Sequence, residues 1–462
     1  MGIANNSQYY FKQNLTWGLI SNASPSFRYT ESGSIFNVSG PSIFPDKNLP
    51  FLAGLLNSVV VRYFLEILSP SISFTPGMMG KIPVVDKAQI IGSVTELVNY
   101  AITTTKEDWH DYEHSWDFQF LPLLTASSDP TPTLESSYTA WIESNRDTIA
   151  EMKRLEEENN RLFIDAYGLA EELTPDVPIE QITLTVNPSY RYGGKLTIDA
   201  QWTRFRHDSM EELASFAIGC MMGRYSLDAP GLIYAHSGNE GFDALLSEGQ
   251  YKTFPADDDG IVPLTDSEWF DDDAANRLVE FVSVAWDRTH LEANLNFLAD
   301  NLSPKKNESS RETLRRYLCD KFFKDHMQTY KKRPIYWLFS SGKEKAFQCL
   351  VYLHRYNEGT LARMRTEYVL PLTSKLASHV KKLEHDVQGS SSTSEAKGLE
   401  KEITRLRKQQ MELSTFDEKL RHYADQQIKL DLDDGVKVNY GKFGDLLAEV
   451  LAIHGKKPET SG

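Results

Sequence analysis

The segment His110-Asp111-Tyr112-Glu113-His114 matches the His-x-x-Glu-His pattern of inverted zinc proteases. In that pattern both histidines lie on one face of a helix and bind a zinc ion, and the glutamate serves as the base. The sequence offers no convincing third ligand on a neighbouring helix. We therefore predict a solvated helix end at this segment and no metal site.

Two aspartate triplets, at 257–259 and 271–273, are the second pattern that could bind a metal ion. Carboxylate oxygens suit Mg²⁺ or Ca²⁺. The spacing resembles no EF-hand loop, however, and the triplets lack the accompanying lysine that a nuclease site needs. The sequence therefore predicts solvated acidic surface at both triplets.

The distribution of charge is uneven along the chain, although the formal net charge is −16. Residues 257–300 contain twelve acidic and two basic residues, whereas residues 305–333 contain ten basic and four acidic residues. A second basic stretch, residues 191–206, contains four cations and one aspartate. A polyanion could therefore meet a local basic face while the rest of the surface repels it.

The bulk composition is that of an ordinary globular protein of 462 residues, long enough for about two to four domains. No apolar run reaches the roughly 20 residues that span a bilayer, so we expect a cytoplasmic protein with no membrane contact. Cys220, Cys319 and Cys349 lie far apart, which argues against a disulfide framework or a zinc knuckle. Each is expected to be a small buried hydrophobe.

The elements that position these residues follow from apolar spacing and turn formers. Short strands and turns are expected over the first 85 residues, interrupted by a helix over 51–68 and followed by the short apolar segment 81–85. A Ser/Asp/Pro-rich linker over 126–133 precedes a long helix over 141–173. Its narrow apolar seam, which includes Asn159, predicts a partner helix.

The remainder of the chain reads as an α-rich mixed domain and a hairpin of two helices. Apolar residues spaced over 361–383 and 399–423 flank a flexible tip at 388–393, which is typical of an antiparallel coiled coil. The overall prediction is an α+β fold with four segments: 1–125, 126–175, 176–335 and 336–462. The first is a small mixed domain, the second a linker and long helix, the third the α-rich domain, and the last a helical spacer.

Five passages, in order, resemble the C-terminal regions of PglX proteins, the adenine-specific DNA methyltransferases of type 1 bacteriophage exclusion (BREX) systems. More loosely they resemble single-chain restriction–modification enzymes. In those families a leucine-rich helix bearing Leu-Asn-Ser leads into a strand ending in Ile-Pro, within a target-recognition domain. The passages are Leu52 to Ser58 with Phe74 to Gly77 and Lys81 to Val84; Asp108-Trp109 with Ser115 to Phe118; Glu156 to Leu169; Arg333 to Ser340 with Tyr356-Asn357; and Leu432 to Tyr440.

The resemblance implies that the first segment is the target-recognition domain of an adenine-N6 methyltransferase. Such enzymes also carry a Rossmann-like domain with a glycine-containing S-adenosylmethionine loop and an Asn-Pro-Pro-Tyr motif, and neither occurs in this sequence. We therefore expect this chain alone to be inactive as a methyltransferase and to hold no cofactor. S-adenosylmethionine would bind the missing methylase half. We therefore expect the chain to be either a fragment or one half of a split protein.

Asn187-Pro188-Ser189-Tyr190 invites comparison with the missing catalytic tetrapeptide, in which asparagine accepts a hydrogen bond from the adenine amine and the aromatic ring stacks on the base. Serine replaces the second proline here, and no glycine-rich loop after a strand provides a cofactor site. We therefore interpret the tetrapeptide as a turn after a strand over 182–186.

Candidate DNA contacts are basic or hydroxyl-bearing residues, because base edges are read by donors and acceptors and phosphates by cations. Duplex DNA, the methylase half of the same protein and other BREX proteins are the expected partners. The alternatives are an interaction scaffold that binds DNA without sequence preference, and an enzyme in its own right, either a permuted methylase or a metal hydrolase. The candidates for base readout are Arg28, Ser71, Ser73 and Lys81, and those for phosphate positioning are Arg191, Lys195, Arg204 and Arg206.

Overall fold

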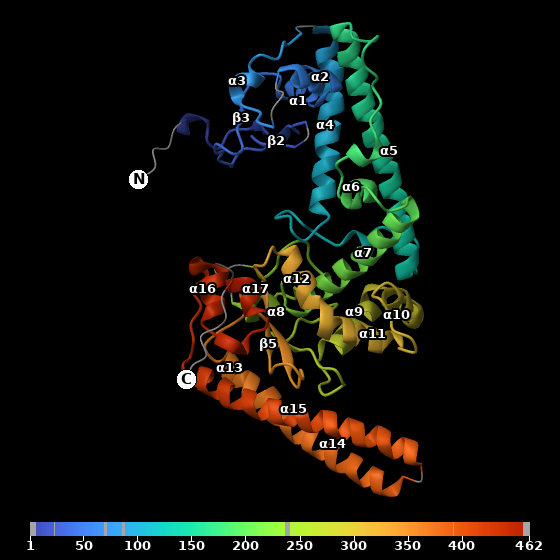
Figure 1. Ribbon diagram of the computed structural model, residues 1–462, viewed down its shortest axis with the longest axis vertical. Coiled ribbons are helices and arrows are strands. Elements are labelled where there is room, and N and C mark those ends of the chain that lie inside the picture. Colours follow the sequence, from blue (N-terminus) through green and yellow to red (C-terminus); the bar gives the residue numbers. More distant parts are fainter. Residues whose placement is uncertain are drawn as a thin grey trace. The chain divides into compact units, whose positions relative to one another are not determined.

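The computed structural model describes residues 6–22, 24–68, 72–85, 88–235, 241–390 and 392–455 (Figure 1). Helices predominate, and the strands form two small antiparallel sheets of three strands each, which confirms the predicted α+β class. The chain forms two compact units. Unit 1 comprises residues 1–110 and 142–202, and unit 2 comprises residues 111–141 and 203–462. Each unit draws on more than one of the four predicted segments.

Unit 1 contains a small sheet and the helices around it, and two long helices are shared between the units. The boundary between the units falls within α5 (Leu134–Tyr167) and α7 (Ile198–Met221). The other elements of unit 1 are β1 (Asn14–Thr16), β2 (Arg28–Thr30), β3 (Ser42–Ile43), α1 (Leu49–Asn57), α2 (Val59–Leu68), α3 (Pro76–Met79), α4 (Ala88–His110) and α6 (Pro188–Tyr192).

Unit 2 consists of a second sheet, several short helices and a helical hairpin. Its elements are α8 (Phe242–Ser247), β4 (Ile261–Pro263), α9 (Ala274–Ala285), α10 (Leu291–Asp300), α11 (Ser310–Tyr317), α12 (Phe323–Thr329), β5 (Tyr336–Ser340), β6 (Gln348–Tyr352), α13 (Thr360–Arg363), α14 (Leu370–Gly389), α15 (Thr393–Asp425), α16 (Gly435–Gly441) and α17 (Val450–His454).

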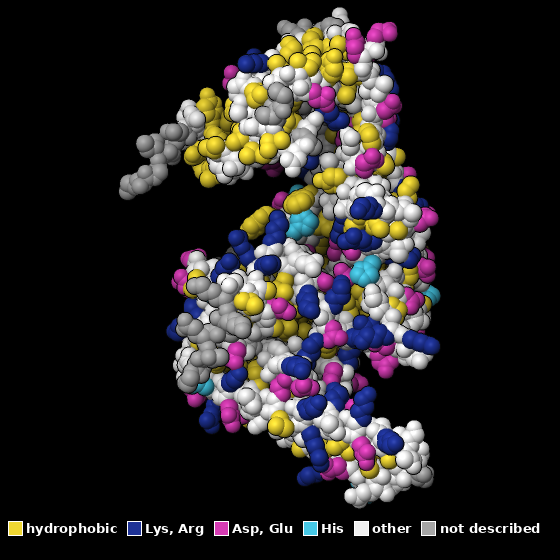
Figure 2. All heavy atoms as spheres, in the orientation of Figure 1, with side chains coloured by type: hydrophobic (Ala, Val, Ile, Leu, Met, Phe, Trp, Pro, Cys, Tyr) yellow, Lys and Arg dark blue, Asp and Glu magenta, His cyan; other side chains and the backbone are white. Residues whose placement is uncertain are grey.

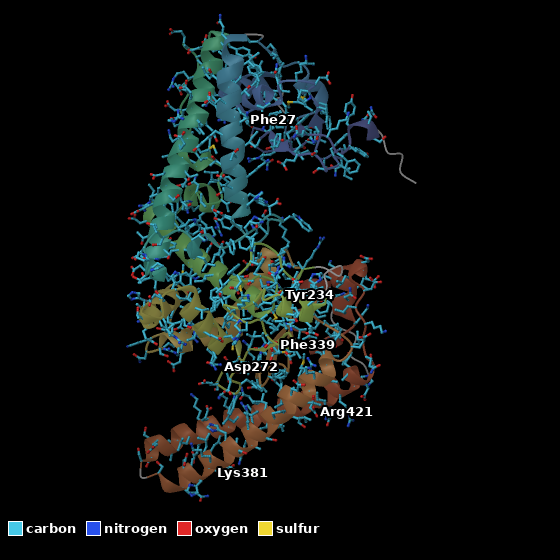
Figure 3. The ribbon with its side chains drawn as sticks, turned by 180° about the vertical axis from the view of Figure 1, so that it is seen from behind. Phe27, Tyr234, Asp272, Phe339, Lys381 and Arg421 are labelled. Atoms are coloured by element: carbon cyan, nitrogen blue, oxygen red, sulfur yellow. The ribbon has the colours of Figure 1, made fainter. Side chains whose placement is uncertain are left out.

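The sheet of unit 1 has the order β2-β1-β3, and the central strand β1 is buried. Trp17 follows β1, and its indole Nε1 donates a hydrogen bond of 2.8 Å to the Phe74 carbonyl. Its ring lies 5.5 Å from that of Phe27, which precedes β2 (Figure 3). These contacts join the sheet to the core formed with α1 and α2.

The helix predicted over 51–68 is present, but it breaks into α1 and α2 at Ser58. The Ser58 backbone is extended, and both its N–H and its hydroxyl donate to the Leu55 carbonyl, at 3.0 and 2.7 Å. The Val59 N–H then donates to Asn160 Oδ1 on α5, at 2.9 Å. The two helices are bent by 65° and satisfy the length and hydropathy of a membrane span only as a pair, and no single described helix does so.

The strand ending in Ile-Pro that the resemblance implies does not form at Ile82-Pro83. Residues 83–85 after α3 lack regular structure, and the exposed Lys81 precedes the buried Ile82. Proline removes a backbone donor at the position where a strand would need one. The Pro83 carbonyl instead accepts a hydrogen bond of 2.5 Å from the Tyr167 hydroxyl at the end of α5.

Helix α1 packs against α4 and α5 through an unusually close approach at Gly54. Asn159 Nδ2 on α5 donates to the Gly54 carbonyl at 3.0 Å. A Cβ at Gly54 would lie 2.7 Å from both Asn159 Oδ1 and Val94 Cγ1. The predicted α5 seam is confirmed at Met152, Leu155 and Asn159, which are buried. It widens toward the C-terminal end, where Phe163 and Ile164 are also buried in the core with α1 and α2.

The predicted hairpin of helices is present as α14 and α15, which run side by side (Figure 1). The buried residues repeat at three- and four-residue intervals, as the sequence predicts: Leu372, Leu376, Val380 and Leu383 on α14, and Ile403, Leu406, Leu413, Phe416 and Leu420 on α15. Glu412 on α15 joins the hairpin to the β5–β6 loop, because its carboxylate accepts from Ser341 Oγ at 2.7 Å and from the Glu344 N–H at 2.6 Å.

The prediction of solvated surface at the aspartate triplets was wrong in part: Asp258 and Asp271 are exposed, whereas the other four aspartates are half-buried or buried. Asp273 is fully buried, caps α9 by accepting from the Asn276 N–H, and forms an ion pair with Arg315. Asp257 accepts the Gly260 N–H at 2.6 Å, and burial raises its pKa to about 7. Both carboxylates organise backbone turns around the second sheet, which explains their density in the sequence.

The cysteine prediction is confirmed in part. Cys220 and Cys349 are buried, Cys319 is half-buried, and all three are free thiols. Burial raises the pKa of Cys220 and Cys349 well above the usual range of a thiol, so these two side chains behave as small hydrophobes.

We expect Gly54→Ala to destabilise the protein by about 1–3 kcal/mol, because the added methyl group overpacks the contact of α1 with α4 and α5. Gly92→Ala on α4 is the matched control. A Cβ there meets nothing within 4 Å, so helix propensity alone should raise stability by up to about 1 kcal/mol. Urea unfolding measures both variants, and equal midpoints for the two would contradict the packing argument.

Candidate nucleic-acid interface

The candidates for base readout belong to unit 1, and those that the structure describes lie on different elements and differ in exposure. Arg28 is exposed on β2, and its guanidinium donates to Thr183 Oγ1 at 3.2 Å. Ser73 is half-buried in a bridge with Ile20, and Lys81 is exposed just after α3. Ser71, the fourth candidate, lies outside the described residues.

The phosphate-positioning candidates divide between the two units. Arg191 and Lys195 belong to unit 1, whereas Arg204 and Arg206 lie on the part of α7 that belongs to unit 2. Lys195 and Arg204 are exposed. Arg191 is half-buried, and its positive charge acts on the Asp108 carboxylate. Arg206 Nε donates to Asn301 Oδ1 at 2.8 Å, so part of its guanidinium serves the fold of unit 2.

A cavity of about 590 Å³ in unit 1 brings one of these candidates together with residues that the sequence analysis did not select. Its wall is built from the 24–29 segment, α1, α2, α4, α5 and the 177–190 segment. Arg28 lines it, as do four charged residues from the helices: Arg62 of α2, Lys106 and Asp108 of α4, and Glu156 of α5. Trp109 and Tyr190, each about half exposed, supply aromatic surface.

Asp108 organises one side of this cavity. Its two carboxylate oxygens accept the N–H groups of Thr185 and Val186 at 2.7 and 2.9 Å. The predicted strand over 182–186 is therefore absent, because a buried side chain replaces a neighbouring strand as the acceptor for these backbone groups. Burial raises the pKa of Asp108, and these two hydrogen bonds and the charge of Arg191 oppose that effect.

The Asn187-Pro188-Ser189-Tyr190 tetrapeptide forms a helix start, in agreement with its interpretation as a local turn. Asn187 is the N-cap of α6 and accepts from the Ser189 N–H at 3.1 Å. Its Nδ2 donates to the carbonyls of Ile179 and Ile182, both at 2.8 Å. The asparagine is buried, so its amide serves the chain and is not presented to a base.

Glu156 is a cavity residue whose carboxyl group has a strongly raised pKa. It lies on α5, one helical turn before Asn159, and has no hydrogen-bond or ion-pair partner among the residues that the structure describes. Burial raises the pKa of Glu156 to about 7, and the nearby charges of Arg28 and Arg62 limit the rise. No feature of the sequence distinguishes Glu156, because it lies in a run of acidic helix residues.

Unit 2 presents a second set of cations that site selection from the sequence missed. Within the basic stretch 305–333, four side chains are engaged in ion pairs: Arg311 with Glu292, Arg315 with Asp273, Arg316 with Glu308, and Lys321 with Glu211. Lys331, Lys332 and Arg333, after α12, are exposed and have no ion pair in the described part of the chain. Figure 2 shows lysine and arginine side chains interspersed with acidic ones on the face in view.

The segment 110–114 is not the solvated helix end that the sequence predicts, because Tyr112 is buried. Helix α4 ends at His110, and Glu113 is half-buried with its carboxylate accepting from Ser215 Oγ at 2.8 Å. Within the described ranges, the group of three potential metal ligands close enough to share an ion is His207, Asp208 and Glu211 on α7. One of the three, Glu211, forms an ion pair with Lys321.

We expect Glu156→Gln to stabilise the protein increasingly as the pH rises. The unfolded chain releases the Glu156 proton near pH 4.5 and the folded chain near pH 7, so the wild-type carboxyl group lowers stability as the pH rises between these values. At pH 8 the variant should be more stable than wild type by about 2–3 kcal/mol, relative to their difference at pH 4.

Urea unfolding at several pH values measures this effect. Glu158→Gln is the matched control, because Glu158 lies on the same helix but pairs with Arg161 and does not line the cavity. A pH-independent difference between Glu156→Gln and wild type would contradict the assigned cause.

Comparison with known proteins gives two long matches, whereas no family model matches the chain. The chain is 45% identical to the adenine-specific methyltransferase BrxX of Escherichia coli O9:H4 (strain HS), over 98% of this chain and 38% of that protein. It is 37% identical to the adenine-specific methyltransferase PglX of Lacticaseibacillus casei (strain Zhang), over 95% of this chain and 35% of that protein. Nearly the whole chain is thus homologous to a segment, somewhat over a third of the length, of adenine-specific methyltransferases named BrxX and PglX.

Proposed function

We propose that this chain is the sequence-specific duplex-DNA recognition portion of an adenine-N6 site-specific methyltransferase of bacteriophage-exclusion defence. The observation that carries the proposal is the similarity to BrxX and PglX over almost the whole chain. Both relatives are named adenine-specific methyltransferases. An enzyme that modifies one adenine among many needs a part that reads the surrounding bases.

The side chains of unit 1 support a role in DNA binding. Arg28, Lys81 and Lys195 are exposed, and none has a carboxylate partner among the described residues. Cations that are not neutralised within the fold remain available to phosphates, and arginine is also suited to the major-groove edge of guanine. We assign Arg28 to base readout and the two lysines to phosphate contacts.

The transfer of the methyl group is assigned to another part of the parent enzyme. S-adenosylmethionine binding in such enzymes needs a Rossmann-like parallel sheet, and both sheets in the described ranges are antiparallel and three-stranded. Asn187, in the tetrapeptide most similar to the catalytic motif, caps a helix. The expected partners are therefore duplex DNA, the methylase half and other proteins of the defence system.

Binding of the 462-residue chain to duplex DNA tests the proposal. One duplex carries the methylation site of the parent enzyme, the other a scrambled sequence, and both are measured over a salt series. We expect a preference for the site that persists as salt rises, because base contacts depend on salt less than phosphate contacts do. Equal, salt-sensitive binding to both duplexes, or none, would instead favour the interaction scaffold.

Three substitutions separate the expected roles. Arg28→Ala should reduce the preference for the site by about 1–3 kcal/mol, whereas Lys81→Ala should weaken binding to both duplexes and reduce the salt slope by about 1. Arg154→Ala is the matched control, because Arg154 is exposed on α5 and already paired with Glu151. A loss with Arg154→Ala as large as that with Arg28→Ala would contradict the assignment of Arg28 to base readout.

A further inference from the structure

The asparagine and glutamate side chains that line the unit 1 cavity fall into two groups. Asn57 and Asn160 are fully engaged by the backbone: Asn57 by both backbone groups of Phe27 and by the Ala53 carbonyl, and Asn160 by Val59 and Pro175. Glu156 has no partner among the described residues, and Asn159 Oδ1 is a buried acceptor without a donor. The fold therefore uses the first group to build the wall and provides no protein donor for the acceptors in the second group.

The positive charges of two arginines, Arg28 and Arg62, offset part of the negative charge of Glu156. Arg62 donates to Gln181 Oε1 and Arg28 to Thr183 Oγ1, each at 3.2 Å, and neither hydrogen bond neutralises the guanidinium charge. Both charges act on Glu156 across the cavity. A cationic ligand such as a polyamine would be attracted by Glu156 but repelled by both arginines. A fitting ligand instead brings N–H donors to the glutamate and a negative group to the arginines.

A nucleotide has this combination of groups. The Watson–Crick edge of guanine presents two adjacent N–H donors, at N1 and at the exocyclic amine, which match the two oxygens of one carboxylate. The phosphate supplies the negative group for arginine. Trp109 and Tyr190 offer rings on which a base can stack. The volume, about 590 Å³, lies within the usual range of small-ligand pockets.

We propose that the unit 1 cavity binds a guanine nucleotide, with Glu156 accepting hydrogen bonds from the base and Arg62 contacting the phosphate. The ligand is either a free mononucleotide or an unpaired nucleotide of a DNA strand, since the chemistry of recognition is the same. Arg28 lines this cavity as well, but the test of the site rests on Glu156 and Arg62, neither of which is assigned to the proposed reading of duplex DNA.

Isothermal titration of the 462-residue chain with 5′-GMP, 5′-AMP and guanosine tests the site. We expect saturable binding of GMP, with AMP at least tenfold weaker because adenine presents an acceptor at N1. Glu156→Gln should weaken GMP binding at least tenfold, since the neutral amide offers one acceptor oxygen. Arg62→Gln should reduce the preference for GMP over guanosine. Glu158→Gln is the matched control and should bind GMP as wild type does.

A second arm distinguishes the two sources of the nucleotide. It compares a duplex that carries one guanine opposite an abasic site with the same duplex fully paired. A preference for the unpaired guanine that Glu156→Gln removes assigns the site to a strand nucleotide. Binding of GMP without that preference assigns the site to free nucleotides. The proposal is overturned if neither GMP nor the unpaired guanine shows binding that depends on Glu156, whatever the result for duplex recognition.

Discussion

The close approach of α1 to α5 at Gly54 is the constraint on which the rest of unit 1 depends. Only a residue without a side chain lets the backbone of α1 lie against Asn159 and Val94 at once. The Asn159–Gly54 hydrogen bond then fixes the rotation of α5 about its axis. That rotation places Glu156, one turn earlier, in the cavity wall, whereas Glu158 faces away and pairs with Arg161. Packing thus determines which of several adjacent glutamates faces the cavity.

On the other side of the cavity, the buried Asp108 carboxylate positions the backbone of the wall. Asp108 holds the backbone of Thr185 and Val186, and the segment continues into the Asn187 cap of α6. No ladder of strand hydrogen bonds is needed, so the segment can curve around the cavity and carry Tyr190 to its wall. Burying a carboxylate is costly unless hydrogen bonds satisfy it, and here the two backbone donors do so.

The sequence predicted elements whose periodicity is long and uninterrupted, and it failed where one side chain decides the outcome. The apolar repeats of α14 and α15 identified the hairpin and its buried residues, because a seam between two helices needs only the repeat. The prediction of a strand over 182–186 was wrong, and that of solvated aspartates was wrong in part, because alternating residues and charge clusters reveal no tertiary partners. Asp108 lies more than seventy residues from the segment it holds, and Arg315 lies 42 residues from Asp273. For the same reason the sequence could not predict that Glu156 has no hydrogen-bond or ion-pair partner among the described residues.

The strong negative charge of the chain becomes compatible with DNA binding once internal pairing is considered. Several basic residues of the 305–333 stretch are held by carboxylates of their own unit; the pairing is strong enough at Glu308 to lower its pKa to about 2. Among the described residues, six cations of the stretch have no ion pair, and three of them, Lys331, Lys332 and Arg333, follow one another after α12. A polyanion meets the local field of such clusters within roughly a Debye length, about 8 Å at physiological salt, and is little affected by more distant carboxylates. Unpaired cations, and not the formal sum of charges, therefore define the surface that a phosphate backbone can contact.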